Sequence, residues 1–333
     1  MLPGRTQAVA AMNRKVVIAD SNFRSDDPER ETLRETGARI ERHQCRTEEE
    51  VLAAAADADA LLVQFAPITR KVIEGLQRCR IIVRYGIGTD NVDVAAASAA
   101  GIPVCNVPDY CLDEVADHTA AFVLALSRKL LPLHRSVENG LWQAEMHARP
   151  LPKPEQSIVG LVGMGRIGER VVRRLLPFGF RIRVYDPYLP ASHPLLSQAN
   201  VMRFDGLEAL WEQADIVSLH VPLTPQTRHI VDERSLGRMK PTAFLVNCSR
   251  GQLVDNEALA RALSGNVIAG AALDVFEEEP LPSGHPLRRC QNLLMTPHAA
   301  YYSDEAFLAL QRQAAEEVAR GLRGEPLRSR VDR

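Results

Sequence analysis

The chain has 333 residues, of which 46% are hydrophobic and 25% charged, and its formal net charge is -2. This composition is that of a globular protein and excludes disordered, collagen-like and coiled-coil chains, while the length suggests about two domains. The balanced charge indicates no nucleic acid or membrane partner, and the longest apolar run, near Thr119–Leu126, is far below the roughly 20 residues that cross a bilayer.

Several chemistries are excluded by patterns that the sequence lacks. The six cysteines are scattered without a C-x-x-C pair, so we expect reduced thiols in a cytoplasmic protein, with no disulfide scaffold and no metal site. There is no H-E-x-x-H helix and no Walker A loop. Residues Met1–Lys15 have no sustained apolar core, so we expect a ragged start there and no secretory signal.

In the first third of the chain, continuous apolar runs alternate with helical patterns. The runs predict strands that are buried on both faces of a parallel sheet, at Val16–Asp20, Ala60–Val63, Ile81–Tyr85 and Ile102–Cys105. The helical patterns cover Pro28–Thr36, Glu48–Ala56, Val72–Leu76 and Val94–Ala100. A long helix is expected next, over Asp113–Trp142, and the proline-rich residues 150–154 end it.

A second series of the same kind follows. Its expected strands are Ile158–Val162, Ile182–Tyr185, Ile216–Val221, Ala243–Asn247, Ile268–Leu273 and Leu293–Thr296, and its helices are Ile167–Phe178, Leu207–Gln213 and Asn256–Leu263. The order of helix, Ala-Asp and strand in Val51–Val63 returns in Leu207–Val221. We therefore predict two doubly wound α/β domains, with the last helix, Glu305–Leu322, returning to the first. The predicted boundaries are 1–112 plus 304–333 for one domain and 113–303 for the other.

A glycine-rich loop links the first strand and helix of the second series. The sequence Gly163-Met164-Gly165-Arg166-Ile167-Gly168 has the strand–loop–helix context in which G-x-G-x-x-G binds the pyrophosphate of a dinucleotide. Asp186 lies 18 residues after Gly168, close to the spacing of about 20 expected for a carboxylate that binds the ribose. Pro187 and Tyr188, not a basic residue, follow it, which favours NAD over NADP.

Three later residues have the chemistry for reducing a 2-keto acid. Arg250 follows one predicted strand and could bind a carboxylate bidentately, and His298 follows another and could exchange a proton. Glu279 ends the acidic run Glu277–Glu279, and a carboxylate beside the imidazole would stabilise its protonated form. By position alone, each of the three could instead be an ordinary packing or surface residue.

Ordered motifs along essentially the whole chain resemble the D-isomer-specific 2-hydroxyacid dehydrogenase family. They are Arg84–Asn91, Cys105–Pro108, Gly163–Gly168, Tyr185-Asp186, His220–Leu223, Asn247–Gly251, Asp274–Pro280 and Thr296–His298. Within that family, Val83-Arg84 and His298–Ser303 are most similar to the C-terminal-binding protein branch, whose animal members are NAD-regulated transcriptional corepressors. Those members usually carry Trp where this chain has Tyr301.

The resemblance implies two Rossmann-like domains with a cleft between them, NAD as cofactor, and a catalytic trio that falls on Arg250, Glu279 and His298. Glu279 is selected among the three glutamates because it directly precedes a proline. Cofactor contacts fall on the glycine loop, including Met164, Arg166 and Ile167, and on Asp186, Val221, Pro222, Thr227, Cys248, Ser249 and Asp274. The substrate carboxylate would meet the backbone N–H groups of Tyr85, Gly86 and Ile87, with Arg84 and Tyr301 also at the substrate.

The expected function is therefore NAD-dependent interconversion of a small 2-keto acid and a D-2-hydroxy acid, in a phosphoglycerate dehydrogenase-like homodimer. The alternative is an NAD(H)-sensing corepressor module with little turnover. No Tyr-x-x-x-Lys occurs, which excludes short-chain dehydrogenase chemistry. A small group of C-terminal arginines, from Arg320 to Arg333, is interpreted as a solvated tail and not as a DNA-binding surface. The identity of the acid stays open among phosphoglycerate, glycerate, glyoxylate, lactate and bulkier acids.

Overall fold

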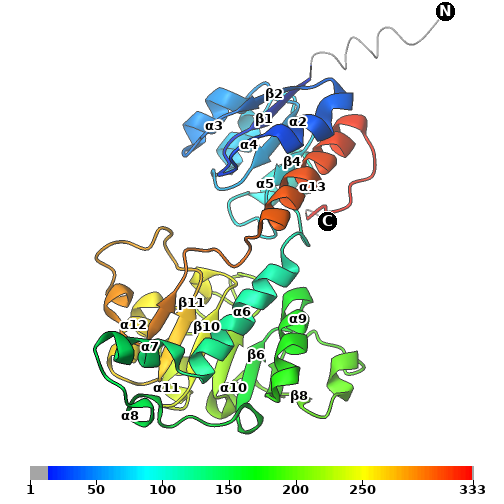
Figure 1. Cartoon of the computed structure of the whole chain (residues 1–333). Coiled ribbons are helices and arrows are strands. Elements are labelled where there is room, and N and C mark those ends of the chain that lie inside the picture. Colours follow the sequence, from blue (N-terminus) through cyan, green and yellow to red (C-terminus); the bar gives the residue numbers. More distant parts are fainter. Residues whose placement is uncertain (1–13, 332–333) are drawn as a thin grey trace, which may run out of the picture. The chain divides into compact units, whose positions relative to one another are not determined.

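The structure is a computed structural model that describes residues 14–331, in which the chain forms two compact units with a parallel sheet each (Figure 1). Residues up to Tyr110 and from Ser303 onward belong to unit 1, and Cys111–Tyr302 form unit 2. Nearly all of the segment for which a ragged start was expected lies outside the described residues. Within residues 14–331, no helix has the length and apolar character that crossing a membrane requires.

Unit 1 is built on a five-stranded sheet with the order β2-β1-β3-β4-β5, in which all neighbours run parallel. The strands are β1 (Lys15–Ile18), β2 (Arg39–Arg42), β3 (Ala60–Val63), β4 (Ile82–Arg84) and β5 (Val104–Cys105). The helices are α2 (Asp27–Leu33), α3 (Glu48–Ala55), α4 (Arg70–Gly75), α5 (Val94–Ala99) and α13 (Asp304–Arg323). Residues of α3, α4 and α5 form the apolar core on one face, and residues of α2 and α13 form the core on the other.

Unit 2 is built on a seven-stranded sheet with the order β12-β11-β10-β9-β6-β7-β8, again wholly parallel. The strands are β6 (Ile158–Val162), β7 (Arg181–Tyr185), β8 (Val201–Arg203), β9 (Ile216–Leu219), β10 (Phe244–Asn247), β11 (Gly270–Leu273) and β12 (Leu293–Met295). The helices are α6 (Leu112–Ser127), α7 (Leu130–Glu138), α8 (Ala144–Ala148), α9 (Arg166–Leu175), α10 (Leu207–Gln213), α11 (Glu233–Arg238) and α12 (Asn256–Ser264). Residues of α6 and α9 pack on one face and residues of α10, α11 and α12 on the other, which confirms the predicted class of two doubly wound α/β domains.

The strand order places β6 at the switch point of unit 2. β6 pairs with β7 on one side and with β9 on the other, so the chain winds away from it in both directions. In open α/β sheets, ligands bind at the carboxyl ends of the strands on either side of this point. The glycine loop that follows β6 is therefore where the fold provides a ligand crevice.

The similarity between the two halves of the sequence has a structural counterpart. In unit 1, the Asp59 carboxylate accepts a hydrogen bond from the N–H of Lys15 at 2.9 Å, at the start of β1. In unit 2, the Asp215 carboxylate accepts one from the N–H of Ile158 at 2.8 Å, at the start of β6. Each aspartate precedes a strand of the same sheet, so both sheets use the same device to align two parallel strands.

The single long helix predicted over Asp113–Trp142 is wrong. The chain forms α6, α7 and α8 instead, and Lys129, between α6 and α7, has a left-handed backbone with a φ of 51°. Pro132 explains why the helix does not continue: proline lacks an N–H group and is accepted in the first turn of a helix but not in its interior. It is the third residue of α7, where that missing donor costs nothing.

Two edge strands were not predicted. β2 and β8 lie at the outer edges of their sheets, and both are short; β2 contains two arginines and a glutamate, and β8 ends in an arginine. Edge strands are often kept short and charged because a long apolar edge would pair with other chains. A pattern search for continuous apolar runs therefore misses them.

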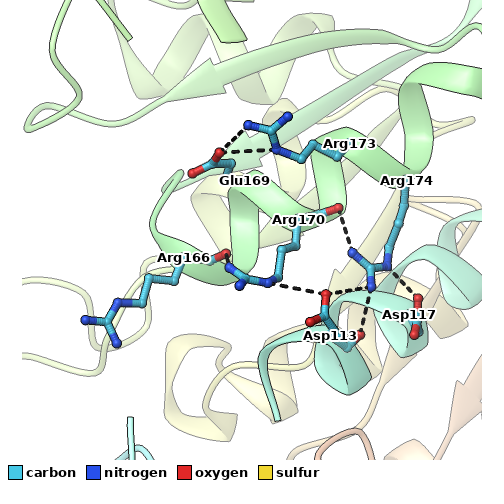
Figure 2. A network of polar contacts seen from close by, with 7 residues as sticks. All are labelled: Asp113, Asp117, Arg166, Glu169, Arg170, Arg173 and Arg174. Atoms are coloured by element: carbon cyan, nitrogen blue, oxygen red, sulfur yellow. Dashed lines mark hydrogen bonds and ion pairs between the residues drawn. The ribbon is translucent and has the colours of Figure 1, made fainter. Parts of the chain in front are cut away.

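A cluster of arginines and aspartates joins α6 to α9 (Figure 2). Arg174 of α9 contacts both Asp113, at 2.9 Å, and Asp117 of α6, while Arg170 contacts Asp113 at 3.3 Å. The hydrogen bond from Arg174 holds the pKa of Asp113 below its usual value. Arg166, at the first turn of α9, extends away from this cluster (Figure 2). The helix that carries the glycine loop is thus held against α6 while its first turn stays available.

We predict that Gly321→Ala destabilises unit 1. A Cβ at Gly321 would lie 2.7 Å from Cγ2 of the buried Ile81, so α13 and the sheet would have to separate. Overpacking of this kind costs about 1–3 kcal/mol, more than alanine gains in helix propensity. The matched control is Gly237→Ala in α11, where a Cβ meets nothing within 4 Å and stability should rise slightly. Thermal unfolding followed by circular dichroism measures both; equal effects at the two sites would contradict the packing argument.

Candidate active site

The glycine loop passes unusually close to the end of β9. Gly163 has a φ of 92°, and a Cβ there would lie 2.8 Å from the carbonyl oxygen of His220. A Cβ at Gly168 would lie 2.9 Å from the carbonyl oxygen of Gly163. Both positions therefore require glycine for the fold itself, the first for its backbone conformation and both for the lack of space.

Gly165 differs from these two glycines because it faces open space. Its backbone is not left-handed, and a Cβ there would meet no atom within 4 Å. It is also the N-cap of α9 and offers no side chain to cap the N–H groups of the first turn, at Arg166 and Ile167. A helix N-terminus that is uncapped and approachable by the backbone of a glycine is suited to binding a pyrophosphate.

Asp186, at the end of β7, folds back over the glycine loop. One carboxylate oxygen accepts the N–H of Met164 at 2.9 Å and the other accepts the N–H of Tyr188 at 2.9 Å. The residue is half-buried, so a carboxylate oxygen has lone pairs left for ribose hydroxyls. The N–H of Met164 is used by this contact, and any role of Met164 toward a cofactor would rest on its other atoms.

The other predicted cofactor contacts form the loops after β9 and β10. Thr227 donates its hydroxyl to the carbonyl oxygen of Pro222 at 2.7 Å, which closes the turn that follows Val221. Ser249 donates to the carbonyl oxygen of Leu219 at 2.7 Å and so ties the end of β10 to the end of β9. Burial raises the pKa of the Cys248 thiol well above its usual value, so it is a packing group and not a reactive thiolate. Their direct contacts with a cofactor stay predictions.

His298 and Glu279 lie together after β12 and β11. Nδ1 of His298 is 2.6 Å from Oε2 of Glu279, whose Oε1 accepts the N–H of Phe276 at 2.9 Å. The two side chains are 38% and 35% exposed. Because Nδ1 is engaged by the carboxylate, Nε2 is the nitrogen available to exchange a proton with a ligand. The ring of Tyr301 meets that of His298 edge-on, with 5.9 Å between the centroids.

Of the three glutamates that competed at the sequence level, Glu279 is the one for which the structure shows a contact with His298. Glu277 instead binds Nε2 of His229 at 2.6 Å and the N–H of Asn256 at 2.9 Å, at the start of α12. It therefore fastens one loop of unit 2 to another.

Asp274 is buried, and its cofactor contact stays a prediction. Asp274 is 0% exposed, and its carboxylate forms hydrogen bonds inside the protein. It accepts the hydroxyl of Thr296 and the N–H groups of Ala299 and Ala300 at 2.8 and 2.9 Å, while its carbonyl oxygen accepts the N–H of His298 at 2.7 Å. His298 has a left-handed φ of 52°, a conformation that only a well-held loop maintains. Asp274 thus fixes the loop that presents the catalytic candidate.

Arg250 follows β10 in an extended conformation, next to the segment that leads to Glu279. A Cβ at Gly251 would lie 1.9 Å from the backbone of Phe276, so the two chain segments are in direct contact. Asn247 donates to the carbonyl oxygen of Arg250 at 2.8 Å, and Nη1 of Arg250 donates to that of Ser249 at 2.7 Å. The three strand ends that carry Arg250, Glu279 and His298 are adjacent in the sheet order β10, β11, β12.

In unit 1, Tyr85 directly follows β4 and is held by the sheet and by the core, and its contact with a substrate stays a prediction. Its N–H donates to the carbonyl oxygen of Val63 at 2.8 Å and is therefore used by the sheet. Its side chain is 1% exposed and donates to the buried Glu29 at 2.7 Å. Gly86 has a φ of 134°, and the Arg84 guanidinium occupies the space where a Cβ of Gly86 would be. Substrate binding by Arg84, Gly86 and Ile87 stays a prediction.

Some residues near the site were missed or underrated by the sequence reasoning. Burial lowers the pKa of His220 to about 4, so this imidazole beside the glycine loop is neutral at physiological pH. His118 of α6 contacts the hydroxyl of Thr296 at 3.0 Å. The available signal was a histidine beside an otherwise apolar helical run, Thr119–Leu126, where an unpaired polar group would be costly.

We predict that Gly165→Ala weakens dinucleotide binding without destabilising the fold. The added methyl group has room in the free protein but would separate the loop backbone from a pyrophosphate, raising the Kd for NADH about tenfold or more, or ~1.4 kcal/mol. Gly163→Ala is the matched contrast, and should lower the unfolding temperature because of its positive φ and the nearby carbonyl oxygen. Fluorescence titration with NADH and thermal unfolding test the pair. A Gly165→Ala protein that binds NADH normally would contradict the assignment of this loop.

Comparisons with known proteins identify the family of the chain. Residues 120–300, more than half of the chain, match the family described as D-isomer specific 2-hydroxyacid dehydrogenase, NAD binding domain. D-3-phosphoglycerate dehydrogenase of Methanocaldococcus jannaschii is 40% identical over 286 residues, which are 84% of this chain and 52% of that protein, so the chain spans about half the length of this relative. Glyoxylate reductase of Thermofilum pendens is 38% identical over 280 residues, 83% of this chain and 82% of the relative.

Solved structures give the same result. The TT0316 protein from Thermus thermophilus is 34% identical, with a TM-score of 0.83 over 95% of this chain and 99% of that one. D-lactate dehydrogenase from Aquifex aeolicus, complexed with NAD and lactic acid, is 25% identical, with a TM-score of 0.82 over 94% of this chain and 96% of that one. These relatives lend no support to the corepressor interpretation. The chain therefore belongs to the D-isomer-specific 2-hydroxyacid dehydrogenase family of NAD-dependent oxidoreductases, and residues 120–300 lie in its NAD-binding domain.

Proposed function

We propose that the protein interconverts a small 2-keto acid and the corresponding D-2-hydroxy acid with NAD as the redox partner. The observation that carries this proposal is the 2.6 Å contact between His298 and Glu279 at the carboxyl edge of an NAD-binding sheet. A histidine oriented by a carboxylate is an arrangement suited to general acid–base catalysis. The names of the relatives, glyoxylate reductase and D-3-phosphoglycerate dehydrogenase, point to small acids as substrates.

The residues of unit 2 fit the cofactor. Gly165 leaves open space at the N-terminus of α9 for a pyrophosphate, and Asp186 offers a carboxylate for the ribose hydroxyls while it repels a 2′-phosphate. When bound, NADH supplies the hydride and NAD accepts it in the reverse direction. NAD is therefore the cofactor that these residues would hold.

His298 is proposed as the acid and base of the reaction. In the direction of reduction, Nε2 donates a proton to the substrate oxygen at C2, and in the direction of oxidation it takes that proton back. Glu279 accepts the hydrogen bond from Nδ1 and so fixes the tautomer and the orientation of the ring. The hydrogen bond from the N–H of Phe276 fixes Glu279 in turn.

Arg250 is proposed to bind the substrate carboxylate. Its planar guanidinium can form two parallel hydrogen bonds to the two carboxylate oxygens, which orients the carbonyl group as well as attracting the charge. The backbone on both sides of Arg250 is held by Asn247 and by the contact between Gly251 and Phe276, so the origin of the side chain is fixed. This rigidity suits a residue that must place a substrate within a fraction of an ångström.

We further propose that the protein is a cytoplasmic homodimer. The six cysteines are free thiols, which supports a reducing compartment. In unit 2, α7, α8 and the segment between them expose large apolar side chains: Leu130, Val137, Leu141, Trp142 and Met146. Beside them is a hollow of about 810 Å³, lined in part by Leu126, Leu263 and Leu294. Apolar side chains gathered around a hollow are typical of a protein–protein interface.

The dehydrogenase proposal predicts the effect of two substitutions. With a 2-keto acid from a panel that includes glyoxylate, pyruvate and hydroxypyruvate, His298→Asn should lower kcat about 10²–10⁴-fold, because the proton donor is lost. Glu279→Gln should lower kcat less and should change the pH dependence of kcat. The reason is that a neutral amide oxygen accepts a weaker hydrogen bond from Nδ1 of His298 than a carboxylate does. NADH oxidation followed at 340 nm, with NADPH in parallel, gives both rates. Normal turnover by His298→Asn would sink the assignment.

The dimer proposal predicts that Trp142→Ser shifts the protein toward the monomer. The indole is 88% exposed in the single chain, so its replacement should raise the dimer dissociation constant at least about tenfold, while the monomer stays folded. Tyr188→Ser is the control, because Tyr188 is 92% exposed but follows β7 and does not line the hollow. Analytical ultracentrifugation over a range of concentrations measures both. A wild-type protein that is monomeric at micromolar concentration would refute the proposal.

A further inference from the structure

A chain of three polar side chains runs from α6 to the loop that carries His298. Nε2 of His118 is 3.0 Å from Oγ1 of Thr296, and Oγ1 of Thr296 is 2.5 Å from Oδ1 of Asp274. His118 and Thr296 are 178 residues apart in the sequence, and all three residues belong to unit 2. These three side chains therefore link α6, on one face of the sheet, to the ends of β11 and β12.

The direction of these hydrogen bonds follows from counting protons. A threonine hydroxyl has one hydrogen, and Asp274 is a carboxylate that can only accept, so the Thr296 hydrogen goes to Asp274. The Thr296 oxygen can then only accept a hydrogen bond from His118. The hydrogen atom between the two residues must therefore be on Nε2 of His118. His118 is thus the donor of the first of two successive hydrogen bonds, and the second ends at the buried carboxylate of Asp274.

Asp274, at the end of these two hydrogen bonds, determines the conformation of the loop that carries His298. The Asp274 carboxylate is buried and needs several donors, which it finds in Thr296 and in the N–H groups of Ala299 and Ala300. Those groups lie on both sides of His298, whose backbone is left-handed. If the Thr296 hydroxyl turned away from Asp274, one of the contacts that hold this conformation would be lost.

Neighbouring residues hold the imidazole ring of His118 in position for the hydrogen bond to Thr296. Its ring meets that of Phe122 edge-on, with 4.5 Å between the centroids, and its Nε2 is 3.9 Å from the Asp274 carboxylate. The helix that carries it is held to α9 by the aspartates of the cluster in Figure 2. The His118 side chain is 24% exposed, so its role is not limited to packing in the apolar core.

We propose that His118 is a positioning residue for His298 and that it acts through the Thr296 hydroxyl and the Asp274 carboxylate. The consequence for turnover rests on the proposed dehydrogenase function, whereas the effect on the geometry of His298 does not. Donation from Nε2 keeps the Thr296 hydroxyl directed at Asp274, and Asp274 keeps the loop in the conformation that presents Nε2 of His298. His118 itself touches no substrate atom in this role.

The kinetic test uses two disrupting variants and two conservative partners. Thr296→Val keeps the shape of the side chain but removes the hydroxyl, and His118→Leu removes the donor. Each should lower kcat about 10- to 100-fold, the range expected for a misplaced catalytic group, while the KM for the 2-keto acid and the Kd for NADH stay within about twofold. Thr296→Ser and His118→Gln retain the hydroxyl and a terminal N–H donor, and should recover kcat to within about threefold of the wild type.

A second measurement does not depend on turnover. The ring nitrogens of the nine histidines can be followed by ¹⁵N NMR across a pH titration, with His298 identified from a His298→Asn spectrum and His118 from a His118→Gln spectrum. In the wild type, the ring of His118 should carry its hydrogen on Nε2. The His298 signals and their titration should change in Thr296→Val and His118→Leu but not in Thr296→Ser or His118→Gln.

The outcomes separate this inference from the proposed function. If the wild type reduces no acid in the panel, the dehydrogenase proposal fails, and the NMR result alone decides whether His118 positions His298. Wild-type His298 signals in both disrupting variants would overturn the inference. So would equal losses in the disrupting and conservative variants, because that pattern indicates general packing. Thermal unfolding of all four variants shows whether each one is folded under the assay conditions.

Discussion

A buried carboxylate must be surrounded by hydrogen-bond donors, and Asp274 imposes this requirement on the centre of unit 2. Its donors come from the loop after β12, so that loop is wrapped around the end of β11 and the backbone of His298 is held in a left-handed conformation. Everything that the catalytic histidine is proposed to do depends on this wrapping. The hydrogen bond to Glu279 then orients the ring that the wrapped loop presents.

The same physical device recurs at other strand ends. In unit 1, the buried Asp20 follows β1 and accepts the N–H groups of Gln64 and Phe65 at 2.9 and 2.7 Å, after β3. Asp59 and Asp215 do the corresponding work at the starts of β1 and β6. A carboxylate with two oxygens can hold two segments at once, which is why short acidic side chains, and not apolar ones, align the loops of both sheets.

The glycines of the loop after β6 differ in how much space surrounds them. Gly163 and Gly168 are required by the fold, because backbone oxygens occupy the space beside them, whereas Gly165 is surrounded by open space. This division explains how a loop can be rigid and still leave room for a ligand. The arginine and aspartate contacts between α6 and α9 complete the arrangement by holding the helix from its far turns, so that its first turn stays accessible (Figure 2).

The sequence by itself was sufficient for the two βα series and the glycine loop, because local periodicity and motif spacing carry that information. The choice of Glu279 came from the family resemblance, and the roles proposed for Asp186, Arg250, Glu279 and His298 stay predictions. It missed β2 and β8, whose charged residues suit a sheet edge, and it joined α6 to α7 across Pro132. Only the tertiary structure decided which glutamate meets His298, that Tyr85 and Asp274 point into the protein, and that His118 reaches Thr296. These contacts join residues from 19 to 178 positions apart, and the order of strands in the sheet, which no local pattern encodes, brings them together.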